Sequence, residues 1–184
     1  MINTHLHPLE KANVLESRFR KLLQNPKRIL KKYIHTGMTV LDLGCGTGFF
    51  TLEMAKLLNG NGKVIAIDLQ DGMLQILRNK LKNSELKPQI QIFNNPEHSL
   101  GIAEKVDFIL AFYSFHEMKY LDKMIQGIRK IITPETKILI SEQKLHVSKN
   151  RFENIIRKME NDGFVICERP RIFFSRSVLM KIGK

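Results

Sequence analysis

Short apolar runs alternate along the chain with longer segments in which apolar residues recur every three or four positions. The short runs predict buried β-strands, and the longer segments predict amphipathic α-helices. Strands are predicted at Thr39–Leu43, Lys63–Asp68, Gln89–Phe93, Val106–Phe112, Lys137–Ser141, Phe164–Glu168 and Ser177–Ile182. Helices are predicted at Ala12–Tyr33 with a break at Pro26, and at Phe49–Leu58, Gly72–Lys82, Tyr120–Ile132 and Asn150–Asp162.

This order of elements predicts βαβ units with right-handed crossovers. We therefore expect an α/β fold: a doubly wound, Rossmann-like, mostly parallel seven-stranded sheet with helices on both faces. No helix separates the last two predicted strands, so they should form an antiparallel hairpin at one edge of the sheet. In such a sheet a ligand lies beyond the carboxyl ends of the strands, beside the first strand.

Composition limits the class of protein. A length of 184 residues suits one domain, and 43% apolar with 26% charged residues is typical of a globular protein. No apolar run approaches the roughly 20 residues of a membrane span, and the first residues lack the layout of a signal peptide. Two cysteines, Cys45 and Cys167, make neither a disulfide framework nor a zinc site. We expect a cytoplasmic protein and leave its oligomeric state open.

The formal net charge of +12 is concentrated at the two ends of the chain. Residues 1–36 hold eight basic and two acidic residues, residues 142–184 hold ten and five, and the middle is nearly balanced. One interpretation is attraction to an anionic partner such as nucleic acid, an acidic small molecule or a membrane surface. The other is a lysine-rich solvated surface, which we favour because no basic run is interleaved with aromatic residues.

A glycine-rich loop follows the first predicted strand, within the segment Val40–Phe50. Gly44 allows a tight turn, and Gly46 lets the backbone approach a ligand because it has no Cβ. Free N–H groups at the start of the next helix favour an anionic group at the same place. The dinucleotide-binding pattern requires glycine where Phe49 stands, and the Gly-Lys-Ser/Thr ending of a phosphate-binding loop is absent.

The pattern D-x-G-x-G-x-G at residues 42–48 resembles the first motif of class I S-adenosylmethionine methyltransferases. Asp68, at the end of the second predicted strand, resembles the second motif of that family. The resemblance implies that the Asp68 carboxylate accepts both ribose hydroxyls of the cofactor and that Leu69 packs on its adenine. It also implies cofactor contacts from Asp42, Gly44, Cys45, Gly46 and Gly48. A Rossmann-like domain that has lost its ligand is the alternative.

The middle of the chain most resembles the ubiquinone/menaquinone C-methyltransferase branch and its small-molecule relatives. In that branch an acceptor for the adenine amine follows the third strand, which here places Asn94 or Asn95. Because Pro96 has no N–H to donate, we favour Asn94 as the acceptor and Asn95 as an N–H donor. The segment that begins at Ala111 is implied to line the methionine half of the cofactor.

His116 is the candidate catalytic residue. Methyl transfer from a sulfonium is an in-line displacement, in which the protein mainly positions the acceptor and excludes water. A base is needed only when the acceptor carries a proton at attack. His116 follows the fourth strand and could be that base or orient the acceptor; the alternative is a hydrogen-bonded histidine beside the cofactor. The neighbouring Glu117 is expected to be a solvated carboxylate.

Motifs of several acceptor classes are missing from the chain. Amine-directed nucleobase methyltransferases carry Asn/Asp-Pro-Pro-aromatic after the fourth strand, where this chain has residues 112–115, Phe-Tyr-Ser-Phe. Cytosine C5 enzymes need a nucleophilic cysteine and arsenite methyltransferases need several, and neither Cys45 nor Cys167 is suitably placed. The pair His5 and His7 is too small a set for a metal site.

The acceptor itself is left open by the sequence. Our first hypothesis is a methyltransferase that uses S-adenosylmethionine, releases S-adenosylhomocysteine and acts on a small-molecule or lipid-like acceptor. The alternatives are an RNA or protein methyltransferase that uses the basic ends, and a cofactor-binding regulator without turnover. We expect residues 37–184 to be the methyltransferase domain and residues 1–36 an N-terminal helical lid, with Phe19, Leu22 and Leu23 facing the pocket.

Overall fold

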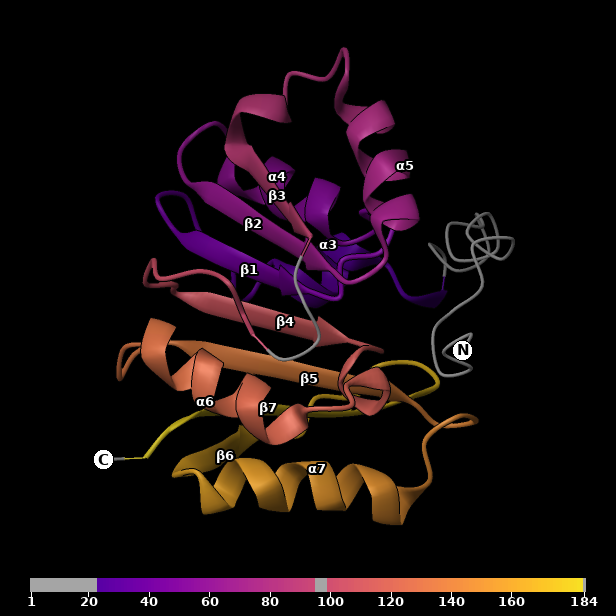
Figure 1. Ribbon diagram of the computed structural model, residues 1–184, viewed down its shortest axis with the longest axis vertical. Coiled ribbons are helices and arrows are strands. Elements are labelled where there is room, and N and C mark those ends of the chain that lie inside the picture. Colours follow the sequence, from indigo (N-terminus) through magenta and orange to yellow (C-terminus); the bar gives the residue numbers. More distant parts are fainter. Residues whose placement is uncertain (1–22, 95–98, 184) are drawn as a thin grey trace.

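The computed structural model describes residues 23–94 and 99–183, in which one sheet has the strand order β3-β2-β1-β4-β5-β7-β6 (Figure 1). Its strands are β1 (Thr39–Leu43), β2 (Lys63–Asp68), β3 (Ile90–Asn94), β4 (Phe108–Phe112), β5 (Lys137–Gln143), β6 (Phe164–Glu168) and β7 (Ser175–Ile182). The helices are α3 (Pro26–Leu30), α4 (Thr51–Leu58), α5 (Asp71–Leu81), α6 (Leu121–Ile131) and α7 (Lys149–Asn161), with short 3-10 helices η2 (Lys87–Gln89) and η3 (Phe115–Glu117).

Strand pairing confirms the predicted doubly wound fold. β1 pairs in parallel with β2 and β4, so the strand order reverses beside β1, where a ligand binds in such sheets. β7 runs antiparallel to both of its neighbours, which confirms the predicted hairpin at the sheet edge. The last strand of the chain inserts between β5 and β6 and leaves β6 as the edge strand.

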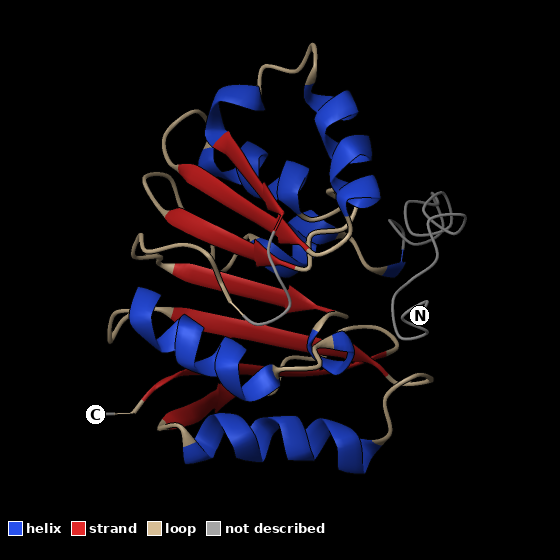
Figure 2. Cartoon of the chain, in the orientation of Figure 1, coloured by secondary structure: helices blue, strands red, loops and turns tan. Residues whose placement is uncertain are grey.

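Helices cover both faces of the sheet (Figure 2). On one face Leu41 and Ile109 belong to a core cluster with the apolar residues of α6 and α7. On the other face Val40 and Leu110 pack with the apolar residues of α3, α4 and α5. Burial on both faces explains why the strands read as continuous apolar runs rather than as alternating patterns.

The element boundaries follow local signals in most places. The Asn25 side chain accepts a hydrogen bond from the Arg28 N–H and so caps α3 as predicted, with Pro26 at its first position. α4 begins at Thr51 rather than at the predicted Phe49, because the turns of the glycine loop continue through residue 50. β5 runs two residues beyond its predicted end and thereby includes residue 142 in the strand.

Part of the predicted lid lies outside the described residues. This holds for Phe19 and Leu22, whereas Leu23 is described and half-buried. Leu30 and Tyr33, which follow it, are buried in the core beside α4. The lid role of residues 1–36 stays a prediction. None of the helices in the described ranges combines the length and apolar character of a membrane-crossing segment.

Candidate active site

Each glycine of the loop after β1 has a backbone conformation that side chains disfavour. The φ angles are +81° at Gly44, +54° at Gly46 and +89° at Gly48. A Cβ on Gly44 would lie 2.4 Å from the Ser114 Cβ, and one on Gly48 would lie 2.4 Å from a Leu77 methyl carbon. A Cβ on Gly46 would meet no atom within 4 Å. Packing therefore requires the outer two glycines, and the middle one borders open space.

Asp68, the last residue of β2, holds this loop through hydrogen bonds to its carboxylate. Its Oδ2 accepts a hydrogen bond of 2.8 Å from the Gly46 N–H, and its Oδ1 accepts one of 2.9 Å from the Gln70 N–H. Burial raises the pKa of Asp68, although these backbone donors lower it again in part. The carboxylate predicted to bind ribose thus lies directly beside the open space at Gly46.

Asp42 and Cys45 are buried around the loop. The Asp42 carboxylate accepts a hydrogen bond of 2.6 Å from the Thr51 hydroxyl, which ties β1 to the start of α4. Burial raises the pKa of Asp42 to about 7. Burial also raises the pKa of the Cys45 thiol, so this cysteine is a neutral packing residue rather than a nucleophile.

The predicted adenine residues follow β2 and β3. Asn94 is exposed, and its side-chain amide donates a 3.2 Å hydrogen bond to the Leu69 carbonyl. This bond joins the carboxyl ends of the neighbouring strands β2 and β3. Asn95 lies outside the described residues. The Ala111 side chain is buried in the core face that α6 and α7 cover.

The structure joins His116 to Glu142, a partner that the sequence pattern does not reveal. His116 Nδ1 lies 2.6 Å from Oε2 of Glu142, and the His116 N–H donates to the other oxygen at 3.1 Å. The Glu142 side chain is fully buried, at the end of β5. Arg151 donates a 2.7 Å hydrogen bond to the His116 carbonyl. The ring and the backbone of His116 are therefore both fixed.

Electrostatics at this pair favour the protonated histidine. Burial lowers the pKa of His116, but the hydrogen bond and charge of Glu142, with the charge of Glu117, outweigh it and leave the pKa raised. Glu117 Oε1 lies 3.8 Å from His116 Nε2. Burial raises the pKa of Glu117 to about 7, so this carboxyl is not the solvated group that was expected. An ionised Glu142 holds a proton on Nδ1, which leaves Nε2 as the basic nitrogen of the neutral ring.

One packing contact and one electrostatic interaction place this pair beside the glycine loop. Ser114, two residues before His116, packs against Gly44, and its hydroxyl donates a 2.8 Å hydrogen bond to the Leu43 carbonyl. The negative charge of Asp68 also acts on Glu117. The signal for Glu142 in the sequence is a carboxylate directly after the apolar run of the fifth predicted strand, because a charge buried there requires a partner.

Tyr113 connects the same edge to the N-terminal segment. Its φ of +63° is uncommon for a residue with a side chain. The Tyr113 hydroxyl lies 2.7 Å from the Ser175 hydroxyl and accepts a hydrogen bond from the Gln24 amide. The Gln24 amide also donates to the Phe173 carbonyl at 3.0 Å.

Groups of three or more His, Cys, Asp or Glu suited to a metal ion do not occur within the described residues.

Comparison with known proteins identifies the family. The family described as "Methyltransferase domain" matches residues 34–171, which include every element from β1 to β6. The chain belongs to this family. The resemblance predicted from the glycine loop and Asp68 is therefore confirmed.

Relatives of this methyltransferase domain include enzymes of quinone biosynthesis. The domain is 27% identical over 118 residues to a demethylmenaquinone methyltransferase of Lactobacillus johnsonii. It is 28% identical over 116 residues to the ubiquinone/menaquinone biosynthesis C-methyltransferase UbiE of Escherichia coli. The matches cover 63% and 59% of this chain and 48% and 44% of the two relatives, so the chain spans about half of their length.

Solved structures share the fold of the methyltransferase domain. A SAM dependent methyltransferase from Aquifex aeolicus has a TM-score of 0.86 at 24% identity, with 97% of this chain and 100% of that chain covered. The glycopeptide N-methyltransferase MtfA complexed with S-adenosyl-L-homocysteine has a TM-score of 0.73 at 12% identity, with 88% and 90% covered. At these identities the likeness shows the Rossmann-like methyltransferase fold.

Proposed function

We propose that this methyltransferase domain transfers a methyl group from S-adenosylmethionine to a small-molecule or lipid-like acceptor. The proposal rests on the glycine loop at the carboxyl end of β1, where Asp68 holds Gly46 beside open space. The family supports methyl transfer as the reaction. Two relatives, named as a demethylmenaquinone methyltransferase and as a ubiquinone/menaquinone biosynthesis C-methyltransferase, support the size and character of the acceptor.

The residues around the loop fit the cofactor. Open space at Gly46 offers a backbone surface without a side chain to the methionine part. The Asp68 carboxylate accepts backbone N–H groups from Gly46, Leu69 and Gln70, and the four lone pairs of its two oxygens leave capacity for a ribose hydroxyl. Leu69 follows β2 and Asn94 ends β3, on the side expected for adenine. When bound, the sulfonium supplies an electrophilic methyl group.

The contribution of the chain to the transfer is to position an acceptor and to take its proton. We assign the role of base to His116, whose Nδ1 is held by Glu142 at 2.6 Å and whose Nε2 then carries the lone pair. Negative charge on Glu142 stabilises the imidazolium that forms as the proton arrives. An acceptor with an acidic proton, such as a phenol or a hydroquinone, suits this arrangement.

Calorimetric titration with S-adenosylhomocysteine tests the cofactor site. We expect binding of this product and no heat from NADH; binding of NADH without a response to S-adenosylhomocysteine would refute the proposal. With a phenolic or hydroquinone acceptor, His116→Ala should lower kcat by about 10²–10⁴-fold while the affinity for S-adenosylhomocysteine stays the same. Methylation of RNA or protein by a preparation that leaves such acceptors untouched would overturn the acceptor class.

A further inference from the structure

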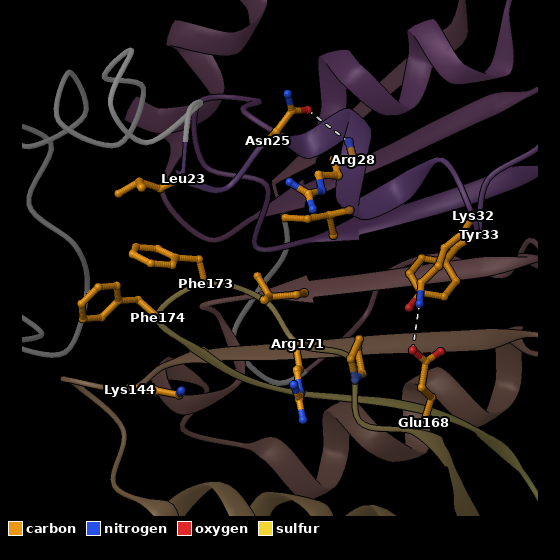
Figure 3. A pocket seen from close by; sticks show the side chains of 13 residues that line it. Leu23, Asn25, Arg28, Lys32, Tyr33, Lys144, Glu168, Arg171, Phe173 and Phe174 are labelled. Atoms are coloured by element: carbon orange, nitrogen blue, oxygen red, sulfur yellow. Dashed lines mark hydrogen bonds and ion pairs between the residues drawn. The ribbon is translucent and has the colours of Figure 1, made fainter.

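A groove of about 930 Å³ lies outside the His116 site, between α3 and the connections that follow β5 and β6 (Figure 3). Leu23, Phe173 and Phe174 lie together at one end, where their side chains extend toward the same side. Lys32 and Tyr33 lie at the other end. The groove thus passes from an apolar end to a polar one.

Three large apolar side chains are exposed on the two neighbouring connections. The exposed fractions are 79% at Leu145, 48% at Phe173 and 51% at Phe174, and we call these three residues the apolar rim. The Lys144 N–H donates a 3.0 Å hydrogen bond to the Phe174 carbonyl, which ties the two connections together. Phe174 has a φ of +54°, a conformation that is strained for a residue with a side chain. Clustered exposure of this kind marks an interaction surface.

Cationic side chains without a charged partner among the described residues accompany the apolar rim. Arg28, Lys144 and Arg171 line the same groove. Within residues 23–94 and 99–183, no ion pair or hydrogen bond engages the charged group of any of the three. The Glu168 carboxylate of the groove already pairs with Lys32 at 2.8 Å. The groove therefore presents a net positive charge beside exposed phenylalanines.

We propose that the apolar rim, with Arg28, Lys144 and Arg171, docks on the surface of an anionic lipid bilayer. Aromatic and aliphatic side chains enter the boundary between headgroups and acyl chains, and arginine and lysine bind lipid phosphates. Charge complementarity favours this occupant. A second copy of the chain would bring the same cations against one another in a two-fold interface and be repelled.

Docking in this orientation serves the neighbouring site. The β5–α7 and β6–β7 connections follow the carboxyl ends of β5 and β6, which is the edge that carries the glycine loop and His116. The bilayer would then face the edge from which an acceptor dissolved in lipid enters. The inference goes beyond the proposed function and does not depend on it, because docking requires neither cofactor nor turnover.

Co-sedimentation with vesicles measures the docking directly. The full chain is mixed with vesicles of phosphatidylcholine that contain phosphatidylglycerol, and separately with vesicles of phosphatidylcholine alone. We expect binding to the anionic vesicles that weakens as salt is added, because the cations contribute through screened charge. Equal binding to both vesicles, or to neither, would overturn the proposal.

The apolar contribution is tested with two matched double variants. Phe173→Ser with Phe174→Ser should weaken vesicle binding at least about tenfold, because two aromatic side chains leave the lipid boundary. Val165→Ser with Ile166→Ser removes two apolar side chains of 42% and 37% exposure from β6 and should leave binding unchanged. Equal losses in both variants would contradict a specific rim.

The charge contribution is tested in the same way. Arg28→Gln with Arg171→Gln should weaken binding about 30-fold. Lys82→Gln with Arg157→Gln removes the same charge from exposed positions on other elements and should weaken it much less. An equal loss of vesicle binding in both variants would mean that net charge alone controls binding, and it would refute the docking site.

Two further measurements distinguish a bilayer from other partners of the apolar rim, and a failure of docking from a failure of the cofactor site. Sedimentation showing a parent dimer that the phenylalanine variant abolishes, or tighter binding of an RNA oligonucleotide than of anionic vesicles, would assign the rim to a different partner and overturn the proposal. The affinity for S-adenosylhomocysteine should be the same in the parent and in all four variants. A failure of docking is therefore distinguishable from a failure of the proposed cofactor site.

Discussion

Replacing Glu142 with glutamine isolates the charge that holds His116. The substitution keeps the size of the side chain, and the amide oxygen can still accept the 3.1 Å hydrogen bond from the His116 N–H. It removes the negative charge 2.6 Å from Nδ1. Because Glu142 is fully buried, water does not screen this charge. A charge-assisted hydrogen bond of this kind contributes about 1.5–3 kcal/mol.

The sign of the effect follows from the raised pKa of His116. A histidine whose pKa in the folded state lies above the ordinary value of 6.5 adds stability that is fully present below that value and disappears as pH rises through the folded pKa. In Glu142→Gln the pKa of His116 should fall. The variant should therefore lose more unfolding free energy, relative to the parent, at about pH 5.5 than at about pH 8.5.

Two measurements check this expectation. An NMR titration of the six histidines, with His116 assigned through His116→Gln, follows its pKa in the parent and in Glu142→Gln. Chemical denaturation at the two pH values gives the unfolding free energies. Glu153→Gln is the control, because Glu153 pairs with Arg169 at the surface and should change stability by less than about 1 kcal/mol.

The pH dependence of catalysis distinguishes a positioning role of Glu142 from a merely structural one. With a lower pKa the base stays deprotonated to lower pH, so the acidic limb of kcat/KM should move to lower pH in Glu142→Gln. The value of kcat should fall about 10–100-fold, because the imidazolium that forms loses its counter-charge. An unchanged pKa of His116, together with equal destabilisation at both pH values, would refute the positioning role of Glu142.

Four other substitutions test the glycine loop and the two carboxylates beside it. Gly46→Val should stay folded, at a strain of about 1–3 kcal/mol from its positive φ, and lose binding of S-adenosylhomocysteine in calorimetry. Gly48→Val should lower Tm further than Gly46→Val does, because its Cβ also meets Leu77. Asp68→Ala should weaken that binding by about 2–4 kcal/mol with an unchanged circular dichroism spectrum, and unaltered affinity would exclude Asp68 as the ribose anchor. Burial raises the pKa of Asp42 from its ordinary value of 3.8 to about 7, so ionisation of this carboxyl lowers the unfolding free energy as pH rises from 3.8 to about 7. Asp42→Asn removes this cost and should therefore stabilise the protein above pH 7 in denaturant titrations. No gain at high pH would show that the buried carboxylate ionises without cost.

Local sequence was sufficient to predict the strands and the loop that form the candidate cofactor site. The strands β1 and β2 have the predicted bounds, because apolar runs between turn residues encode burial without reference to distant partners. The cap at Asn25 with Pro26 is equally local. Gly44, Gly46 and Gly48 have positive φ, and the glycines in the sequence are enough to indicate it, because glycine adopts this conformation without a steric cost.

Tertiary packing decided which glycine borders open space and which residues hold His116. Ser114 and Leu77 fill the positions over the outer glycines, and no neighbouring residue in the sequence predicts either contact. Glu142 lies 26 residues from His116 and reaches it because β5 pairs with β4 in the register Phe112↔Ser141. Periodicity describes faces of elements and does not encode the register between them.

The edge of the sheet shows the same division. Two strands without an intervening helix predict a hairpin, and β6 with β7 forms it. The insertion of β7 beside β5, and with it the position of Phe173 and Phe174 next to Leu145, depends on hydrogen bonds between segments that are distant in the chain. Apolar residues in a connection read the same in the sequence whether they are buried or exposed, because exposure is a property of the whole fold.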